Sequence, residues 1–139
     1  LVAPFKPESL APLTGIFTLE GQSGIGEYLG SKNQIEIKNS VQWVSVACGS
    51  LHSLALKNDG TVWASGENIC YEAGIDSTQS HITQFTKLPV SDIVFITTFD
   101  RSSFLIDKSG KAYSFGLNES KQLGVCKDSS CLGITELCE

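Results

Sequence analysis

A repeat of fifty residues constrains the fold more than any other feature of the sequence. Between residues 44 and 74, adding fifty to a residue number gives an identical or similar residue at many positions, and the register holds without a gap. The identical pairs are Val44 and Val94, Ser53 and Ser103, Gly60 and Gly110, Gly66 and Gly116, Asn68 and Asn118, and Gly74 and Gly124. A weaker third copy precedes them, with Ile16-Phe17 in the place of Val62-Trp63. Repetition at this period indicates small structural units that stack on one another.

Within each copy, the residue pattern is that of short antiparallel strands. Apolar residues alternate with other residues at the strand period of two, and the Asn-Asp-Gly of residues 58–60 has the composition of a tight turn. Gly66 and Gly116 end a strand where a bulge or a close backbone approach needs glycine. The predicted strands are residues 44–47, 53–56, 61–64 and 83–87, with 34–38 in the weak copy. Four short strands in fifty residues match the size of one propeller blade.

A resemblance to a known family rests on two stretches of these copies. Residues 44–68 read VSVACGSLHSLALKNDGTVWASGEN and residues 110–124 read GKAYSFGLNESKQLG. Both resemble the repeat of the regulator of chromosome condensation family. The second copy departs from the family pattern, because Cys48-Gly49 becomes Thr98-Phe99 and His52 becomes Ser102.

The resemblance implies an all-β fold. We expect a β-propeller sector of about two and a half to three four-stranded antiparallel blades, as a fragment of a larger ring of about seven blades. The repeats are expected at residues 8–38, 41–88 and 91–124, and residues 125–139 as an irregular Cys-containing tail or the start of the next blade. Because a blade buries its faces only against neighbouring blades, the remaining blades of the parent ring, or another chain, are expected partners. The absence of Met also favours a piece of a longer protein.

The charge pattern argues against nucleic acid and membranes as partners. The chain has 15 acidic and 10 basic residues, a formal net charge of −5, and one arginine, Arg101. Binding to DNA or RNA relies on a basic patch that neutralises phosphates, which scattered lysines do not supply. No window approaches the roughly 18 consecutive apolar residues of a membrane helix.

No residue pattern indicates catalysis or a cofactor. His52 lies in the His-Ser-Leu-Ala-Leu segment of the repeat, where a structural hydrogen bond is expected, and the glycine-rich residues 21–30 lack the spacing of a nucleotide-binding loop. Three acidic residues have separate turn or loop explanations; they are Asp59, Glu67 and Glu72. We therefore predict a non-enzyme without catalytic, cofactor-binding or metal-binding residues.

The five cysteines leave several interpretations open. Cys126, Cys131 and Cys138 could ligate zinc, but three loosely spaced ligands without a nearby histidine do not suit a structural zinc site. A disulfide between Cys126 and Cys131, or three free thiols, is favoured instead. Cys48 and Cys70 are expected to pack as small buried hydrophobic residues. The odd number favours reduced thiols and an intracellular protein, cytoplasmic or nuclear.

The repeat also explains a glycosylation triplet and the aromatic residues. Asn118-Glu119-Ser120 matches the acceptor triplet, but Asn118 occupies the repeated turn position. The aromatic residues predicted to lie in the core between blades are Trp43, Trp63, Tyr113 and Phe115.

The expected function is that of a protein–protein interaction module, a scaffold or adaptor that acts through loops between strands. The candidate loops are residues 21–30, 67–82 and 118–131. A first alternative, implied by the resemblance, is part of a guanine nucleotide exchange factor for a Ran-type small GTPase. A second alternative is a proteinaceous enzyme inhibitor of similar fold. The predicted partner is a protein in each case.

Overall fold

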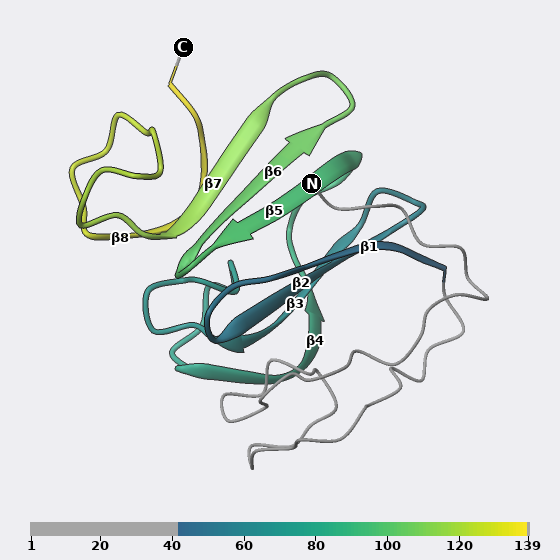
Figure 1. Ribbon diagram of the computed structural model, residues 1–139, viewed down its shortest axis with the longest axis horizontal. Coiled ribbons are helices and arrows are strands. Elements are labelled where there is room, and N and C mark those ends of the chain that lie inside the picture. The colour runs from purple at the N-terminus through teal and green to yellow at the C-terminus, as the bar shows by residue number, and fades with distance from the viewer. Residues whose placement is uncertain (1–41, 139) are drawn as a thin grey trace.

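The computed structural model describes residues 42–138, which form two four-stranded antiparallel sheets (Figure 1). The first sheet contains β1 (Trp43–Cys48), β2 (His52–Lys57), β3 (Val62–Glu67) and β4 (His81–Lys87). The second sheet contains β5 (Ile93–Phe99), β6 (Ser102–Asp107), β7 (Ala112–Leu117) and β8 (Cys131–Glu136). Each sheet has its strands in sequence order, so each copy of the fifty-residue repeat forms one sheet. The expected copy at residues 8–38, with loop 21–30, lies outside the described residues.

The pairing of strands repeats with the same period as the sequence. His52 pairs with Gly66 in the first sheet, and Ser102 pairs with Gly116 in the second. Both sheets have a register shift at the start of their first strand and a second one next to Gly66 or Gly116. A Cβ atom on Gly116 would come within 2.3 Å of the Arg101 carbonyl oxygen, so the close backbone approach predicted here is present.

The turns between the second and third strands are built as the sequence predicts. Gly60 has a φ of 81°, which favours glycine, and its N–H donates to the Lys57 carbonyl at 3.0 Å. Asp59 Oδ1 accepts a hydrogen bond from the Thr61 N–H at 3.0 Å. In the second sheet, Asp107 Oδ1 accepts from the Ser109 N–H at 2.9 Å. Local side-chain acceptors therefore fix both hairpins.

The C-terminal segment differs from the expectation. We expected residues 125–139 to be an irregular tail or the start of a next blade, but residues 131–136 form β8, the fourth strand of the second sheet. β8 pairs with β7, and Leu117 lies opposite Cys131. The second repeat therefore extends past residue 124. The sequence pattern did not predict its fourth strand, which follows a long loop.

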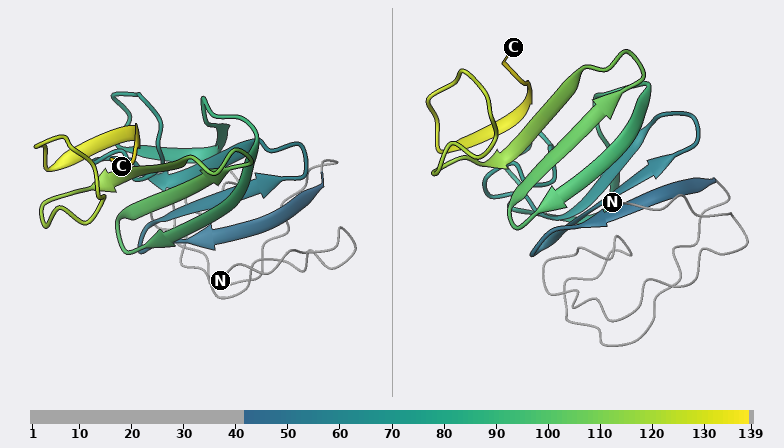
Figure 2. Two further views of the ribbon diagram at one scale, coloured as in Figure 1. Left: turned by 90° about the horizontal axis from the view of Figure 1, so that it is seen from above. Right: turned by 45° about the horizontal axis from the view of Figure 1, so that its top comes forward.

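The hydrophobic core lies between the two sheets, which pack face to face (Figure 2). The first sheet contributes Ala47, Leu54, Leu56, Val62, Ala64 and Ile82, and the second contributes Ile93, Ile96, Leu105 and Phe115. The main contacts between the sheets join β5 to β1 and β2. No helix in residues 42–138 is long and apolar enough to cross a membrane.

The four aromatic residues predicted for this core divide into two groups. Phe115 is fully buried in it, and Tyr113 packs against it. Trp43 and Trp63 lie on the other face of the first sheet, since Trp63 pairs with Ala55 whereas Leu54 points into the core. The two indole rings contact each other edge to face, with centroids 6.3 Å apart.

Candidate recognition surface

A hydrogen bond between His52 and Ser103 joins one sheet to the other. His52 Nε2 lies 2.7 Å from Ser103 Oγ, and Ser103 Oγ donates to the Glu72 carbonyl oxygen at 3.1 Å. Because the hydroxyl proton is used in that second bond, Nε2 of His52 carries its own proton and donates. His52 is 1% exposed, and burial lowers its pKa to about 4. The structural hydrogen bond expected of His52 is therefore present, and the ring is neutral near pH 7.

The one arginine of the chain also crosses between the sheets. Arg101 Nε donates to Glu72 Oε1 at 2.8 Å and to Glu67 Oε2 at 3.1 Å. Glu72 is completely buried, and its second carboxylate oxygen accepts the Cys70 N–H at 2.7 Å. We expected separate turn or loop roles for Glu67 and Glu72, but the structure brings both side chains together on Arg101. A lone arginine in a chain of net charge −5 was the signal that could have pointed to this cluster.

The two departures of the second repeat from the family pattern are physically linked. A Cβ atom on Gly49 would lie 2.3 Å from His52 Cε1 and 2.5 Å from the Asp100 carbonyl oxygen. The buried imidazole therefore requires glycine at position 49. In the second repeat the equivalent pair is Phe99 and Ser102, and the Phe99 residue is 80% exposed. The smaller serine leaves room for a side chain at the glycine position.

The open face of the second sheet carries a cavity of about 340 Å³. Its lining residues are Phe99, Asp100, Ser102, Phe104, Ser120 and Gln122. Fifty residues earlier, the equivalent positions include Ser50, His52 and Glu72. These bind Asp100 and Arg101 in the β5–β6 turn and Ser103 on β6. The cavity therefore lies where a following sheet would place the same kind of contacts.

The two described candidate loops occupy equivalent positions in the two sheets. Residues 67–82 connect β3 to β4 and residues 118–131 connect β7 to β8, and both lie at the left in Figure 1. Asn68 Nδ2 donates to the Ile75 carbonyl at 2.8 Å, and Asn118 Nδ2 donates to the Ser129 carbonyl at 3.0 Å. The repeated asparagine therefore holds each loop by its backbone. Asn118 is 1% exposed, so its amide is closed to glycosylation in the folded chain.

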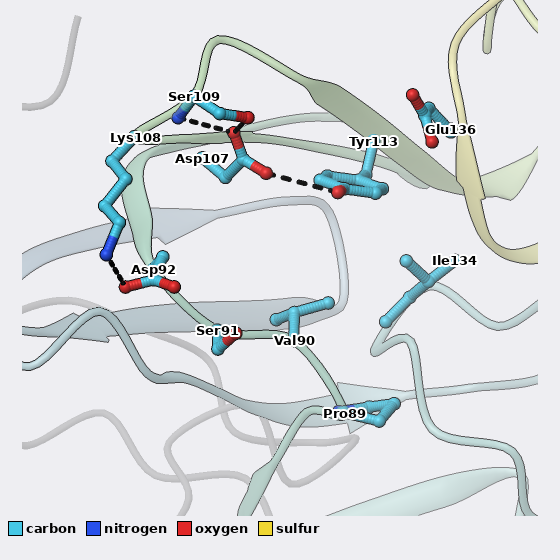
Figure 3. A pocket seen from close by; sticks show the side chains of 10 residues that line it. All are labelled: Pro89, Val90, Ser91, Asp92, Asp107, Lys108, Ser109, Tyr113, Ile134 and Glu136. Carbon is cyan, nitrogen blue, oxygen red and sulfur yellow. Dashed lines mark hydrogen bonds and ion pairs between the residues drawn. The ribbon is translucent and has the colours of Figure 1, made fainter.

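A groove separates the outer parts of the two sheets. One cavity of about 580 Å³ extends over the β4–β5 connection and the Asp107–Ser109 turn, and a second of about 410 Å³ extends between Tyr71 and the start of β8. Pro89 and Ile134 line both cavities, so the two lie side by side, and together they form the groove. Figure 3 shows Val90 and Ile134 on opposite sides of the larger one.

Acidic side chains surround the apolar lining of this groove. Asp92 pairs with Lys108 at 2.5 Å, and Glu136 pairs with Lys111 at 3.2 Å. Asp107 accepts a hydrogen bond from the Tyr113 hydroxyl at 3.2 Å, as drawn in Figure 3. The hydrogen bonds that Ser109 and the Lys111 backbone donate to this carboxylate lower the pKa of Asp107. The groove thus combines apolar side chains with acidic ones, and the lowered pKa of Asp107 favours its ionised form.

The cysteines pair differently from the expectation. Cys70 is bonded to Cys131, and Cys126 is bonded to Cys138, with Cα atoms 4.8 and 5.9 Å apart. The expected Cys126–Cys131 pair, and the alternative of three free thiols, are therefore wrong. Cys70 is buried as expected but is disulfide-bonded, whereas Cys48 is free and exposed. Within residues 42–138, no group of His, Cys, Asp and Glu side chains could hold a metal ion.

Comparisons with known proteins agree with this architecture. The family model of the regulator of chromosome condensation (RCC1) repeat matches residues 43–72. "Protein RCC2 homolog" of Danio rerio is 35% identical over 112 residues, which covers 76% of this chain and 22% of that protein. "Probable E3 ubiquitin-protein ligase HERC6" of Homo sapiens is 28% identical over 112 residues, covering 76% of this chain and 11% of the relative.

Solved structures show the same fold. The crystal structure of Prp20p from Saccharomyces cerevisiae matches with a TM-score of 0.77 and 21% sequence identity, covering 88% of this chain and 33% of Prp20p. The two described sheets are therefore blades of a β-propeller, as expected. The chain spans about a third of this structural relative and less than a quarter of the two sequence relatives.

Proposed function

We propose a function from the premise that the chain belongs to the regulator of chromosome condensation (RCC1) repeat family. In this proposal it is a non-catalytic protein–protein interaction module. The proposal assigns recognition to the groove between the blades and to loops 67–82 and 118–131, which flank it. The observation that carries it is this arrangement of two equivalent, internally bonded loops beside one apolar and acidic groove. Loops on a rigid scaffold are a common site of recognition.

The composition of the groove indicates the kind of segment that would bind. Val90 and Ile134 offer apolar contacts, while Asp92 and Glu136 place carboxylates at the rim. A partner segment with an apolar residue next to lysine or arginine would match both features. The exposed face around Phe99 is a separate surface, which we assign to a neighbouring blade of the parent ring or of another chain.

A pair of tryptophan substitutions tests this function. Ser91 is exposed and lines the groove, so Ser91→Trp would fill the groove without disturbing the core. Gln84 is exposed on β4 and lines neither groove cavity, which makes Gln84→Trp a matched control. We expect Ser91→Trp to reduce binding of a co-purifying protein partner at least tenfold and Gln84→Trp to leave it unchanged. Equal binding by both variants would rule out the groove as the recognition site.

Guanine nucleotide exchange on a Ran-type small GTPase is the second candidate. The observation that favours it is the likeness in fold to Prp20p, whose structure is described together with its binding properties to Gsp1p and histones. Exchange requires that the module bind the states of the GTPase with different affinity. The test is release of a fluorescent guanine nucleotide from a Ran-type GTPase in the presence of the full chain. An unchanged release rate would exclude this activity for the chain.

No ligase activity is assigned to the chain, because the match to the HERC6 ligase covers 11% of that protein. We place the protein inside the cell, in the nucleus or the cytoplasm, as part of the same proposal. Disulfides are uncommon in these compartments, where thiols are kept reduced, and the two cysteine pairs therefore require an explanation of their own.

A further inference from the structure

The Cys70–Cys131 bond crosses from one blade to the next at the groove. Cys70 lies in loop 67–82 of the first blade, and Cys131 is the first residue of β8 in the second. The main strand contacts between the blades involve β5, β1 and β2, whereas β8 contacts β7 of its own blade. Cys131 also lines the smaller cavity of the groove. The disulfide thus ties β8 to the neighbouring blade at the groove, away from the main strand contacts.

The two sulfur atoms belong to segments that are already positioned. The Cys70 N–H donates to Glu72, whose carboxylate holds Arg101 of the second blade. Cys131 lies opposite Leu117 in the β7–β8 pair. The Cα atoms are 4.8 Å apart, within the range of protein disulfides. The separation of the two Cα atoms therefore permits a disulfide between the blades.

The repeat indicates that neither position needs a cysteine to form a blade. Fifty residues from Cys70 the second copy has Ser120, and fifty residues before Cys131 the first copy has His81. Both copies nevertheless form the same four-stranded sheet. A serine at the position of Cys70 and a histidine at that of Cys131 are thus compatible with the blade, so we expect the reduced chain to stay folded.

A second disulfide acts on the same loop. Cys126 is bonded to Cys138, twelve residues further along, and Cys131 lies between them. Loop 118–131 is therefore tethered at residue 126 to the segment after β8 and at residue 131 to the first blade. Closing loops by disulfides restricts their conformational freedom.

We propose that Cys70 and Cys131 form a reversible thiol–disulfide clasp that closes one end of the groove and fixes loop 118–131. In the reduced chain, β8 is joined to the first blade by no covalent bond, and the groove can widen. A role of this clasp in regulating partner binding rests on the proposed function of the groove. The existence of a redox-sensitive disulfide between the two blades does not depend on that function.

The oxidation step uses a small disulfide such as oxidised glutathione. Cys131 is the more exposed of the two, so its thiolate attacks first and forms a mixed disulfide, releasing one glutathione thiolate. The Cys70 thiolate then attacks the sulfur of Cys131 and releases the second glutathione thiolate. The two cysteine sulfurs together lose two electrons, which reduce one glutathione disulfide to two thiols. The two protons lost by the cysteines go to these glutathione thiolates.

The first experiment maps the bond in the full chain. The protein is incubated with oxidised or reduced glutathione, free thiols are blocked with N-ethylmaleimide, and the peptides are analysed by mass spectrometry. We expect a cross-linked peptide of Cys70 and Cys131 after oxidation and its loss after reduction, with Cys48 alkylated in both samples. A different pairing in the oxidised chain, or free thiols at both positions, would overturn the proposal.

The second experiment measures hydrogen exchange of the β8 amides in both redox states. We expect exchange at least tenfold faster in the reduced than in the oxidised wild type, and faster exchange in oxidised Cys70→Ser than in the oxidised wild type, although Cys126–Cys138 is intact in both oxidised proteins. Cys131→Ser is a second variant with the same expectation, and Cys48→Ser is the matched control that should behave as the wild type. Equal exchange in the two states of the wild type, or global unfolding on reduction, would contradict a reversible clasp.

Partner binding separates this proposal from the proposed function. In one outcome, the disulfide forms as mapped, but partner binding is the same in both redox states and in Ser91→Trp. The groove is then not the recognition site, and the clasp is still supported. If binding is lost in Ser91→Trp but β8 exchange is insensitive to glutathione, the groove stands and the clasp is refuted.

Discussion

His52 Nε2 of one repeat lies 2.7 Å from Ser103 Oγ of the next, fully buried between two β-sheets. This hydrogen bond connects a strand of one blade to the equivalent strand of its neighbour. It gives His52 of the first described copy a structural role in the contact between the blades. The same interface contains the Arg101–Glu72 ion pair, so polar groups as well as the apolar core specify how the blades stack.

Stability should depend on pH through His52. Its pKa is lowered to about 4 by burial, against an ordinary value near 6.5, although Glu72 and Asp100 act to raise it. The unfolded chain therefore binds more protons than the folded chain between these values, and stability is lost as pH falls from about 6.5 towards 4. We expect a loss of about 2 kcal/mol between pH 7.5 and 4.5 from this group.

Denaturant unfolding of the wild type and of His52→Gln at both pH values measures this contribution. The variant should be less stable at pH 7.5, because it loses a buried hydrogen bond, but its stability should change less on acidification. An equal pH dependence in both proteins would show that the imidazole does not titrate as described.

The Arg101–Glu72 pair should be strongly coupled. Arg101→Met leaves the buried Glu72 carboxylate without its cation, and we expect a loss of about 3 kcal/mol of unfolding free energy. Adding Glu72→Gln removes the uncompensated charge and should recover part of that loss. A double-mutant cycle by denaturant unfolding measures the coupling, and strictly additive effects would contradict the ion pair.

Position 49 should tolerate a side chain only when the imidazole is absent. Gly49→Ala places a Cβ atom 2.3 Å from His52 Cε1, so it should destabilise the wild type by about 2 kcal/mol. The same substitution in a His52→Ser background should cost at least about 1 kcal/mol less, because serine is the residue of the second repeat. The cost does not vanish, since the Asp100 carbonyl oxygen is also close. Equal costs in both backgrounds, from unfolding curves, would refute the link.

Asn118 should hold the loop between β7 and β8. Its side chain donates to the Ser129 carbonyl and accepts from the Leu123 N–H at 3.1 Å, so Asn118→Ala leaves two backbone groups without partners. We expect a loss of about 2 kcal/mol and faster hydrogen exchange confined to residues 118–131. Glu119→Ala, at the exposed neighbouring position, is the control. Unchanged exchange in the loop would contradict this role.

The sequence predicts the blades well because their determinants are local. The alternation of apolar residues and the turn glycines depend on residues close in the chain, and the fifty-residue period transfers them from one copy to the next. The strands β1 to β7 lie where these signals fall. β8 was missed because few residues of the two copies are identical beyond Gly74 and Gly124, so the repeat pattern is weak over the fourth strand although β8 lies fifty residues after β4. Its pairing with β7 depends on a partner across a long loop.

The polar contacts between the blades and the Cys70–Cys131 disulfide could not be predicted because they join residues of different repeats. Arg101 meets Glu72 across 29 residues, and Cys70 meets Cys131 across 61. Which side chains face each other there depends on how the sheets stack, and a single sequence does not encode that in its spacing. The exposure of Cys48 was not predicted either. Cys48 is the last residue of β1, and its side chain is exposed.

A crystal structure of the full chain tests most directly whether the fifty-residue period corresponds to stacked four-stranded sheets. We predict that residues 43–87 and 93–136 superpose on one another, with the His52–Ser103 hydrogen bond and the Leu54–Phe115 core between them. Helical layers, or two copies that do not superpose, would contradict the account.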